Sequence, residues 1–218
     1  MNHGPTGRRL GVRTRRTRES LRVGEATFGL GGKGRMGNRV RRILFLCTGN
    51  SVRSQMAEAL LRYRGAGRFE VSSAGSHPAG GVHGMALQVL DEIRVPAKGL
   101  RSKSWDEFKG EVFDAVITLC GSARDEAGNP CPVWPADDSG REPVRAHWGF
   151  EDPSRSQVIG IEAHLEEFRR VRDEIRECVE WLATAAGEVL DDDAAFADLV
   201  GRIAESAPNP REVGSGEG

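Results

Sequence analysis

Long hydrophobic runs and paired cysteines are both missing from this sequence. The 218 residues include four cysteines and no C-x-x-C pair, which argues against a disulfide framework and against a zinc site. No apolar stretch approaches the ~20 residues that a membrane-spanning helix needs, and no hydrophobic signal region follows the N-terminal arginines. We therefore expect a cytoplasmic protein with no bound metal, whose cysteines are either catalytic or buried.

A large net charge is also absent, but the value of −1 combines two unlike parts of the chain. Residues 1–42 carry a charge of +10, whereas the remaining residues carry −11. An acidic domain binds nucleic acid poorly, so we expect no nucleic-acid partner for the folded part. The basic segment has no helical or strand periodicity and is expected to be disordered. It is expected to be a nucleic-acid-binding or partner-binding arm, a transit-like segment or sequence upstream of the true start, and we favour the interpretation in which it takes no part in the chemistry.

The composition sets the expected domain organisation. With 38% hydrophobic residues, the chain is long enough for one ordinary domain with a hydrophobic core. We predict a disordered extension over residues 1–39, one folded domain over residues 40–185, and a short helix with a flexible acidic tail over residues 186–218.

The clearest functional signal lies between residues 43 and 61. The apolar run ILFL at 43–46 has the length of a buried strand, and apolar residues recur at helical spacing from Met56 to Leu61, with Glu58 and Arg62 on the other face of the helix. The loop CTGNSVR joins the two, from Cys47 to Arg53. A loop between a buried strand and a helix N-terminus directs successive backbone N–H groups at one point, which is typical of an anion site.

The residues of this loop indicate nucleophilic chemistry on an oxyanion. A thiol in such a positive potential is expected to be a thiolate at neutral pH, which makes Cys47 the candidate nucleophile. The planar guanidinium of Arg53 suits a tetrahedral oxyanion. The alternative is a buried cysteine beside a surface arginine, and the combination of residue types disfavours it. The predicted oxyanion-binding residues are Thr48, Gly49, Asn50, Ser51, Val52, Arg53 and Ser54.

Strand and helix patterns alternate along the rest of the domain. Further strands are predicted at residues 68–75, 112–120 and 144–148, and helices at 84–94, 161–182 and 193–203, with a helical turn at 105–108. This order predicts an α/β fold with a parallel sheet flanked by helices, which binds its ligand at the carboxyl ends of the strands. Cys178 lies on the apolar stripe of the long helix and is interpreted as a structural thiol.

The segment CTGNSVRSQMAEA resembles the active-site loop of the arsenate reductases that are built on the low-molecular-weight tyrosine phosphatase fold. The resemblance covers residues 41–182 and implies a four-stranded parallel sheet. Reductases and phosphatases of this fold share Cys-x5-Arg-Ser, so the loop alone does not separate them. Two other segments bear on the difference, VITLCGSARDEAGNPCP and HWGFEDPS.

The second of these segments contains the candidate general acid. An oxygen that leaves the attacked oxyanion needs a proton, and the resemblance implies that Asp152, directly before Pro153, supplies it. Trp148 and Phe150 are expected to shield this carboxyl group. Glu151 is the alternative acid, and an Asp-Pro pair that only forms a turn is the alternative without chemistry.

The first segment contains two thiols that a phosphatase would not need. A reduction requires two electrons, and two thiols supply them when they form a disulfide. Cys120 ends a predicted strand and is expected to reach Cys47, while Cys131 lies in a loop rich in Gly and Pro. The resemblance implies a relay in which Cys120 attacks the Cys47 adduct and Cys131 then attacks Cys120. Alternatively, Cys120 is an ordinary buried residue and Cys131 is incidental.

The relay implies an external reductant and no tightly bound cofactor. Thioredoxin or a similar protein would reduce the final disulfide, and mycothiol or glutathione are the alternatives. Arsenate is the expected substrate, with phosphate and sulfate as competing oxyanions, and the protein is expected to be a monomer. The loops after Cys120 look longer than usual in the family. The entropic cost of closing a loop rises only slowly with its length, so the relay remains possible.

The sequence departs from the family pattern in two further places. Val52 stands where many of these reductases have another cysteine, and its absence should not remove activity. Some members hold a potassium ion behind the loop, and Asn50, Glu58 and Ser73 match three of its ligands. The fourth ligand, an Asp, falls near Lys103. We predict that Lys103 pairs with Glu58 and replaces the ion.

Two other functions compete with arsenate reduction. A protein tyrosine phosphatase would normally place aromatic residues after the Asp-Pro pair, but Ser154 and Arg155 follow here. A non-catalytic oxyanion sensor or redox-regulated binding module would not need an intact set of Cys47, Arg53 and Asp152.

Overall fold

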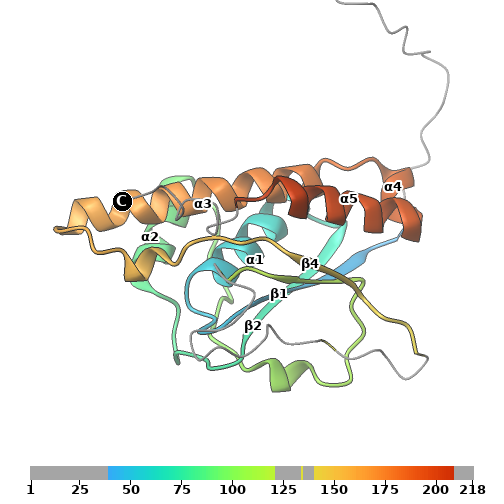
Figure 1. Cartoon of the computed structure of the whole chain (residues 1–218), viewed down its shortest axis with the longest axis horizontal. Coiled ribbons are helices and arrows are strands. Elements are labelled where there is room, and N and C mark those ends of the chain that lie inside the picture. The colour runs from blue at the N-terminus through green and yellow to red at the C-terminus, as the bar shows by residue number, and fades with distance from the viewer. Residues whose placement is uncertain (1–38, 121–133, 135–139, 209–218) are drawn as a thin grey trace, which may run out of the picture. The chain divides into compact units, whose positions relative to one another are not determined.

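The computed structural model describes residues 39–120, residue 134 and residues 140–208. Strands and helices alternate through most of these residues, as the sequence predicts (Figure 1). In chain order the elements are β1 Arg41–Cys47, α1 Arg53–Arg64, β2 Phe69–Gly75, α2 Gly84–Glu92, the 3-10 helix η1 Trp105–Phe108, β3 Ala115–Thr118, β4 Val144–His147, the 3-10 helix η2 Pro153–Arg155, α3 Ile161–Ala183, α4 Gly187–Asp191 and α5 Asp193–Ser206.

The strands form one parallel sheet in the order β2-β1-β3-β4. This confirms the predicted four-stranded parallel sheet. Because all the strands run in one direction, their carboxyl ends lie at the same edge of the sheet, and we call this edge the carboxyl edge. Cys47 is the last residue of β1, and Cys120 follows two residues after the end of β3. The topology therefore puts both cysteines at the carboxyl edge.

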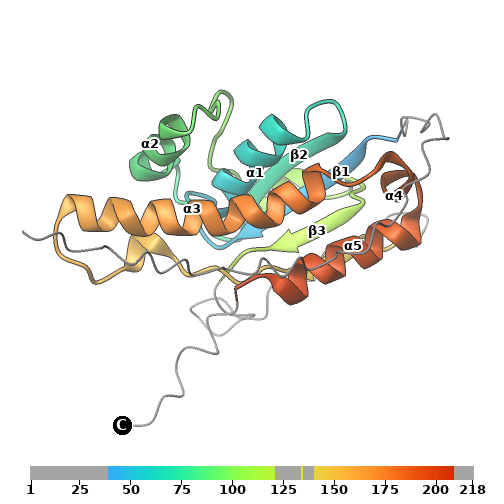
Figure 2. The same ribbon diagram turned by 90° about the horizontal axis from the view of Figure 1, so that it is seen from above.

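Each face of the sheet has its own hydrophobic core, because successive strand residues point to opposite faces. Ile43 and Phe45 of β1 pack in the larger core, to which α1, α2, α3 and α5 contribute. Leu44 and Leu46 pack in the smaller core with Trp134 and the residues around η1. The helices α3 and α5 lie on one side of the sheet and η1 lies on the other (Figures 1 and 2).

The long helix α3 buries the stripe that its periodicity predicts. Its buried residues include Cys178, and burial raises the pKa of this thiol to about 12. A thiol with such a pKa stays protonated at neutral pH and is a poor nucleophile. Cys178 is thus a core residue, as predicted. Among the described residues, no helix is both long and apolar enough to cross a membrane.

The C-terminal helices differ from the expectation of a separate segment after residue 185. Leu190 of α4 and Phe196 of α5 are buried in the larger core, and α4 was not predicted at all. Arg41 fastens these helices to the sheet, because its buried guanidinium lies 4.3 Å over the Phe196 ring and its Nε donates to the Leu190 carbonyl at 2.7 Å. Residues 187–206 therefore belong to the main folded unit.

Two predicted elements are shorter in the structure than expected. The strand expected over 112–120 spans only Ala115–Thr118, and the helix expected to reach residue 94 ends at Glu92. Arg94 adopts a left-handed backbone conformation with φ 57°, which ends the helix shortly before Pro96. The predicted N-terminal extension and the loop that contains Cys131 lie outside the described residues, apart from Trp134 in that loop.

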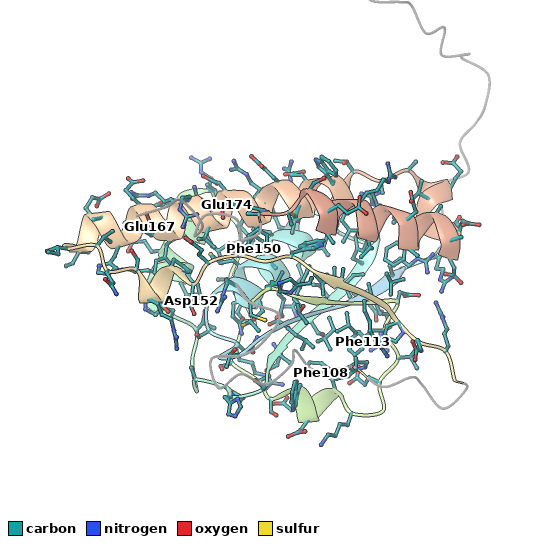
Figure 3. All side chains as sticks on the ribbon, viewed as in Figure 1. Phe108, Phe113, Phe150, Asp152, Glu167 and Glu174 are labelled. Carbon is teal, nitrogen blue, oxygen red and sulfur yellow. The ribbon has the colours of Figure 1, made fainter. Side chains whose placement is uncertain are left out.

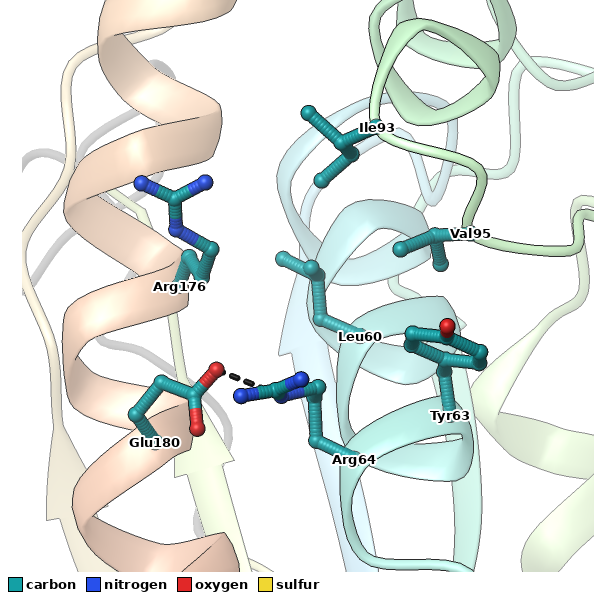
Figure 4. A pocket seen from close by; sticks show the side chains of 7 residues that line it. All are labelled: Leu60, Tyr63, Arg64, Ile93, Val95, Arg176 and Glu180. Carbon is teal, nitrogen blue, oxygen red and sulfur yellow. Dashed lines mark ion pairs between the residues drawn. The ribbon is translucent and has the colours of Figure 1, made fainter.

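A pocket of about 250 Å³ lies between α1 and α3 (Figure 4). An ion pair between Arg64 and Glu180 crosses it. Its lining residues on α1 come from the C-terminal half of that helix, which points away from the carboxyl edge where α1 begins. The pocket is therefore separate from the site that the sequence predicts. It is lined by Leu60, Tyr63, Arg64, Ile93, Val95, Arg176 and Glu180.

Candidate active site at the carboxyl edge

The predicted anion loop connects β1 to α1 and is held from outside by residues 77–83. The backbone N–H groups of His77, Ala79 and His83 each donate at 2.9 Å to the carbonyls of Thr48, Gly49 and Ser51, in that order. In a trans peptide unit the C=O and N–H groups point in opposite directions. Fixing these carbonyls outward therefore turns the following N–H groups toward the centre of the loop, as an anion site requires.

Asn50 is the internal brace of the loop. Its backbone is left-handed, with φ 44°, a conformation that asparagine tolerates better than most residues. Its buried side-chain amide donates to the hydroxyls of Ser54 and Ser73 at 2.9 and 2.8 Å. Its Oδ1 accepts from the Lys103 backbone N–H at 2.7 Å. Three other segments of the chain thus bind one side chain, which fixes the loop conformation before any ligand arrives.

Gly75, the last residue of β2, lets the loop lie directly against the sheet. A Cβ at this position would lie 2.4 Å from the Thr48 carbonyl oxygen and 2.9 Å from the Asn50 nitrogen. Both atoms belong to the loop backbone and cannot move without deforming it. A glycine is therefore required here for close approach of the two backbones.

Cys47 begins the loop with its sulfur 2.9 Å from the Ser54 hydroxyl. That hydroxyl already accepts from Asn50, so its own hydrogen remains available for the sulfur. The sulfur thus lies beside a hydrogen-bond donor in the first turn of α1. The geometry fits the predicted role of Cys47 as nucleophile.

Arg53 closes the loop with a guanidinium that is almost entirely buried. Its Nη1 donates to the Phe150 carbonyl at 3.0 Å and its Nη2 to Asp152 at 2.8 Å. Its Nε is buried and has no hydrogen-bond partner among the described residues. A buried donor without a partner costs about 1–3 kcal/mol, and such groups usually have a functional reason. An oxyanion in the loop would supply the acceptor.

Asp152 is oriented toward Arg53, and Glu151 is not. One Asp152 oxygen accepts from Arg53, while the other accepts from the backbone N–H and hydroxyl of Ser154 at 3.1 and 2.6 Å. The Glu151 carboxylate instead pairs with Arg170 of α3 at 2.8 Å. Asp152 and the buried Phe150 follow β4 on the way to α3 (Figure 3). The geometry therefore favours Asp152 over Glu151 as the acid.

Comparison with known proteins identifies the family. Residues 42–193 match the low molecular weight phosphotyrosine protein phosphatase family. The chain is 41% identical over 133 residues to an arsenate reductase of Halalkalibacterium halodurans, which covers 61% of this chain and 88% of that protein. The chain belongs to this family, in its arsenate reductase branch.

Other members of the branch agree in fold and extent. A glutaredoxin arsenate reductase of Synechocystis is 32% identical over 141 residues, which cover 65% of this chain and 95% of that protein. The crystal structure of an arsenate reductase from Archaeoglobus fulgidus superposes with a TM-score of 0.51 and 29% identity, over 66% of this chain and 99% of that one. The family core is thus nearly complete here, and about a third of the chain lies outside it.

Within this arsenate reductase fold, the position of Cys120 follows from the sheet. Leu46 lies opposite Thr118 in the parallel register, and the Leu119 N–H donates to the Leu46 carbonyl at 2.8 Å. Cys47 and Cys120 each directly follow one of these two bonded residues. The Cys120 side chain is buried. Among the described residues, no cysteine is in a disulfide.

Cys131, the third thiol of the predicted relay, lies outside the described residues. Trp134, three residues later, is buried and packs edge-on against Phe113 with ring centroids 5.7 Å apart. Its carbonyl accepts from Arg145 of β4 at 2.8 Å. Trp134 is therefore fixed to the smaller core by its ring and by its carbonyl group.

Glu58 is in the interior, which corrects its predicted place on the polar face of α1. This helix lies between the sheet, the anion loop and α3, so residues 53–61 are all buried. The Glu58 carboxylate accepts from the Ser73 hydroxyl and pairs with Arg62 and with Lys103, whose Nζ lies 3.2 Å away. Burial lowers the pKa of Lys103, although the charge and hydrogen bond of Glu58 oppose this.

The Lys103 ammonium pairs with Glu58, as predicted from the resemblance for a lysine that replaces the potassium ion. A cation site does not fit these residues, because Glu58 already has two cationic partners and Asn50 is bonded to the Lys103 backbone. Across the residues that the structure describes, no group of three His, Cys, Asp or Glu side chains is arranged to hold a metal.

We therefore predict that activity does not depend on potassium. At equal ionic strength, turnover and melting temperature in potassium chloride and in sodium chloride are expected to agree closely, because the internal ammonium supplies the charge. Replacing Lys103 with Met should leave Glu58 short of a buried partner and destabilise the fold by about 3–5 kcal/mol. Thermal melting of both proteins in both salts measures this. A several-fold activation of the unmodified protein by potassium alone would contradict the prediction.

Three features of the site were not identified from the sequence. Gln55 donates from its buried amide to the Asn50 backbone and side-chain oxygens at 3.0 Å and to the Arg101 carbonyl at 2.7 Å. The segment 77–83 holds the loop, and Thr118 binds His147 at the carboxyl edge. Of these features, only Gln55 left a signal in the sequence, namely a polar residue at a buried position of a helix. The segment 77–83 holds the loop through backbone atoms, and such contacts do not restrict which side chains are present.

Proposed function

We propose that this protein reduces arsenate to arsenite with the thiols of Cys47, Cys120 and Cys131, and that a thioredoxin-like protein regenerates it. Membership of the arsenate reductase branch supports the reaction class. The observation that carries the relay is the register of β1 and β3, which brings Cys120 to the edge that holds Cys47.

In the first step, arsenate binds in the anion loop and the Cys47 thiolate attacks arsenic. The loop N–H groups and the Arg53 guanidinium bind the remaining oxygens, and the unpartnered Nε is available for one of them. Asp152, 2.8 Å from Arg53, gives a proton to the departing hydroxyl, which leaves as water. The buried Trp148 and Phe150 keep solvent from this side.

In the second step, Cys120 attacks the sulfur of the Cys47 adduct. A sulfur–sulfur bond forms, the sulfur–arsenic bond breaks, and its electron pair reduces arsenic from the +5 to the +3 state. Strand spacing of about 4.8 Å and a rise of about 3.3 Å per residue put the Cα atoms of Cys47 and Cys120 on the order of 6 Å apart. A disulfide needs a Cα separation of about 4.4–6.8 Å and Cβ atoms that point toward one another. Residues one position out of register point to opposite faces of a sheet, so Cys120, which lies beyond the end of β3, must turn out of the strand conformation for the two sulfur atoms to meet.

In the third step, Cys131 displaces Cys47 and forms a disulfide with Cys120, which an external thiol protein reduces. Trp134, three residues after Cys131 in the sequence, is buried in the smaller core, which also contains Val116 of β3. Thioredoxin is the proposed donor. The Synechocystis relative is a glutaredoxin arsenate reductase, so the donor must be tested directly.

A phosphatase activity is expected only as a side reaction. The loop binds phosphate as well as arsenate, because both are tetrahedral oxyanions. However, Ser154 and Arg155 follow the Asp152–Pro153 pair, where a protein tyrosine phosphatase is expected to have aromatic residues. This segment therefore offers no aromatic surface for a phosphotyrosine ring.

The acid is tested with Asp152→Asn. This variant keeps the shape of the side chain but cannot protonate the leaving oxygen, so turnover with arsenate should fall about 10²-fold. The matched control is Glu151→Gln, which removes a carboxylate that pairs with Arg170 and should change turnover less than threefold. Steady-state arsenate reduction measures both. Equal losses in the two variants would remove Asp152 from the role.

The function itself is tested by arsenate-dependent oxidation of NADPH, coupled through thioredoxin and thioredoxin reductase. A parallel reaction with glutaredoxin, glutathione and glutathione reductase identifies the donor, and aryl phosphate hydrolysis measures the side reaction. We expect arsenate-dependent turnover with thioredoxin. Aryl phosphate hydrolysis without arsenate-dependent oxidation by any thiol donor would assign the protein to the phosphatases instead.

A further inference from the structure

Five successive carbonyl groups of the anion loop, at residues 48–52, each accept a hydrogen bond from a group outside the loop. Backbone N–H groups of the segment 77–83 and of α1 bind four of them. The fifth belongs to Asn50, and among the described residues its donor is the side chain of Gln55, at 3.0 Å. The Ser51 N–H group belongs to the same peptide unit as this carbonyl, so its direction depends on one side chain.

The contacts of the Gln55 amide allow only one orientation. Its nitrogen lies 3.0 Å from both the backbone oxygen and the Oδ1 atom of Asn50, and 2.7 Å from the Arg101 carbonyl oxygen. The Asn50 Oδ1 is itself identified as an oxygen because it accepts from the Lys103 backbone N–H. None of the three oxygens carries a hydrogen, so only an NH₂ group can bind them. A flipped amide would set oxygen against oxygen.

The other end of the amide indicates that Gln55 is present for its donors. The side chain is completely buried, and its Oε1 has no hydrogen-bond partner among the described residues. A buried acceptor without a partner destabilises the fold, and such groups usually have a functional reason. The NH₂ group supplies that reason, because it joins the anion loop to the segment behind it.

This connection fixes the Asn50 peptide unit from two sides. The Arg101 carbonyl accepts from Gln55 and also from the Lys103 ammonium at 3.2 Å. Because the same amide binds the Arg101 carbonyl outside the loop, the Asn50 carbonyl points away from the loop centre and the Ser51 N–H group points toward it. A donor that is directed before the ligand arrives binds it without a further cost of ordering.

We propose that Gln55 is a positioning residue that sets the affinity of the loop for its oxyanion. It acts through the peptide unit between Asn50 and Ser51. The inference rests on the proposed function only in taking arsenate as the oxyanion, since any tetrahedral dianion uses the same N–H groups. These groups bind the oxygens before and during the attack alike, so loss of the Gln55 amide raises Kd and KM and changes kcat little.

Sulfate is the probe, because it is a tetrahedral dianion that does not react with a thiol and keeps its charge near neutral pH. Calorimetry measures its Kd for the unmodified protein and for Gln55→Leu, in which an apolar side chain replaces the donor. We expect this Kd to rise about tenfold. In steady-state arsenate reduction by the same variant, KM should rise by a similar factor while kcat stays within about threefold.

Gln55→Glu keeps the size of the side chain and gives a result that lost packing cannot. The introduced carboxyl group donates a hydrogen bond only while it is protonated. Its sulfate affinity, relative to the unmodified protein at the same pH, should therefore fall as the pH rises, and the same ratio for Gln55→Leu should stay constant. Lys103 attracts this carboxylate and Glu58 repels it, so they shift the pH of the fall without changing its direction.

Two control variants separate positioning from stability. Val200→Ala removes buried atoms from α5, which packs against β4 and α3, and should lower the melting temperature without changing the Kd of sulfate. Gln88→Leu makes the same exchange of side chains at an exposed position of α2 and should change neither.

A sulfate Kd for Gln55→Leu within twofold of the unmodified value would overturn the proposal, and so would normal binding by Gln55→Glu in alkaline solution. If Gln55→Leu does not fold, Gln55→Glu decides. An unmodified protein that binds no sulfate has no oxyanion site to position, which also refutes the role of Gln55. If the unmodified protein binds sulfate but reduces no arsenate, the proposed function fails, and the Kd values still decide the role of Gln55.

Discussion

Replacing Cys120 with serine is expected to abolish repeated arsenate reduction while aryl phosphate hydrolysis continues within twofold of its normal rate. Serine cannot form the Cys47–Cys120 disulfide, so the sulfur–arsenic bond is not broken and its electron pair does not reduce arsenic. Phosphate chemistry in the anion loop ends with attack by water and does not use this thiol. The coupled NADPH assay measures the first activity, and release of the aryl alcohol measures the second.

A matched control comes from the fourth cysteine. Cys178 is buried in the core among apolar residues, and burial keeps its thiol protonated. Cys178→Ser should therefore leave arsenate turnover within about twofold, with some loss of stability from the polar replacement. Cys131→Ser should release one arsenite equivalent and then stop. Sustained thioredoxin-dependent turnover by Cys120→Ser or Cys131→Ser would contradict the relay.

The second large effect is expected for Arg53→Lys. The guanidinium binds the Phe150 carbonyl and Asp152 at once and has a third buried donor for the oxyanion. A lysine ammonium is a point charge and cannot bond to all three in this geometry. We expect kcat/KM to fall about 10³-fold for both arsenate and aryl phosphate, equal to roughly 4 kcal/mol of transition-state stabilisation.

The same substitution at an exposed arginine is the control for Arg53→Lys. Arg202 of α5 pairs with the exposed Asp198, one turn earlier, and such pairs contribute little. Arg202→Lys should leave both reactions and the melting temperature nearly unchanged. If Arg53→Lys lowered turnover with arsenate but not with aryl phosphate, Arg53 would act in the relay rather than in anion binding.

The local sequence was sufficient to predict the strand–loop–helix arrangement of the anion loop and most of the secondary structure. The strand, loop and helix between residues 41 and 64 are encoded by adjacent residues, so their order is visible as a change from a strand pattern to a helical one. α3 was predicted nearly to the residue, because its apolar stripe repeats over many turns. β3 and the end of α2 were less accurate, because strand ends and caps depend on a few hydrogen bonds.

Charged residues in the interior could not be recognised in the same way. Glu58 looked like a surface residue because a carboxylate on a helix is normally solvated, and only the partners Ser73, Arg62 and Lys103 make its burial tolerable. Arg41 is a similar case, since its partners come from Asp114 and from the C-terminal helices α4 and α5. These contacts join residues far apart in the chain.

The sequence by itself determined the chemistry that is available: a cysteine at the head of an anion loop, an arginine that closes it, and further cysteines for electrons. Residue types and short spacings carry that information, because each group acts through its own atoms and its immediate neighbours. Only the tertiary structure decided which groups meet. The parallel register puts Cys47 and Cys120 at the same edge of the sheet, the turn after β4 gives Asp152 rather than Glu151 to Arg53, and the pairing of β3 with β4 sets His147 against Thr118. These contacts join residues that are far apart in the sequence. They depend on how the whole domain packs, which no short stretch of sequence encodes.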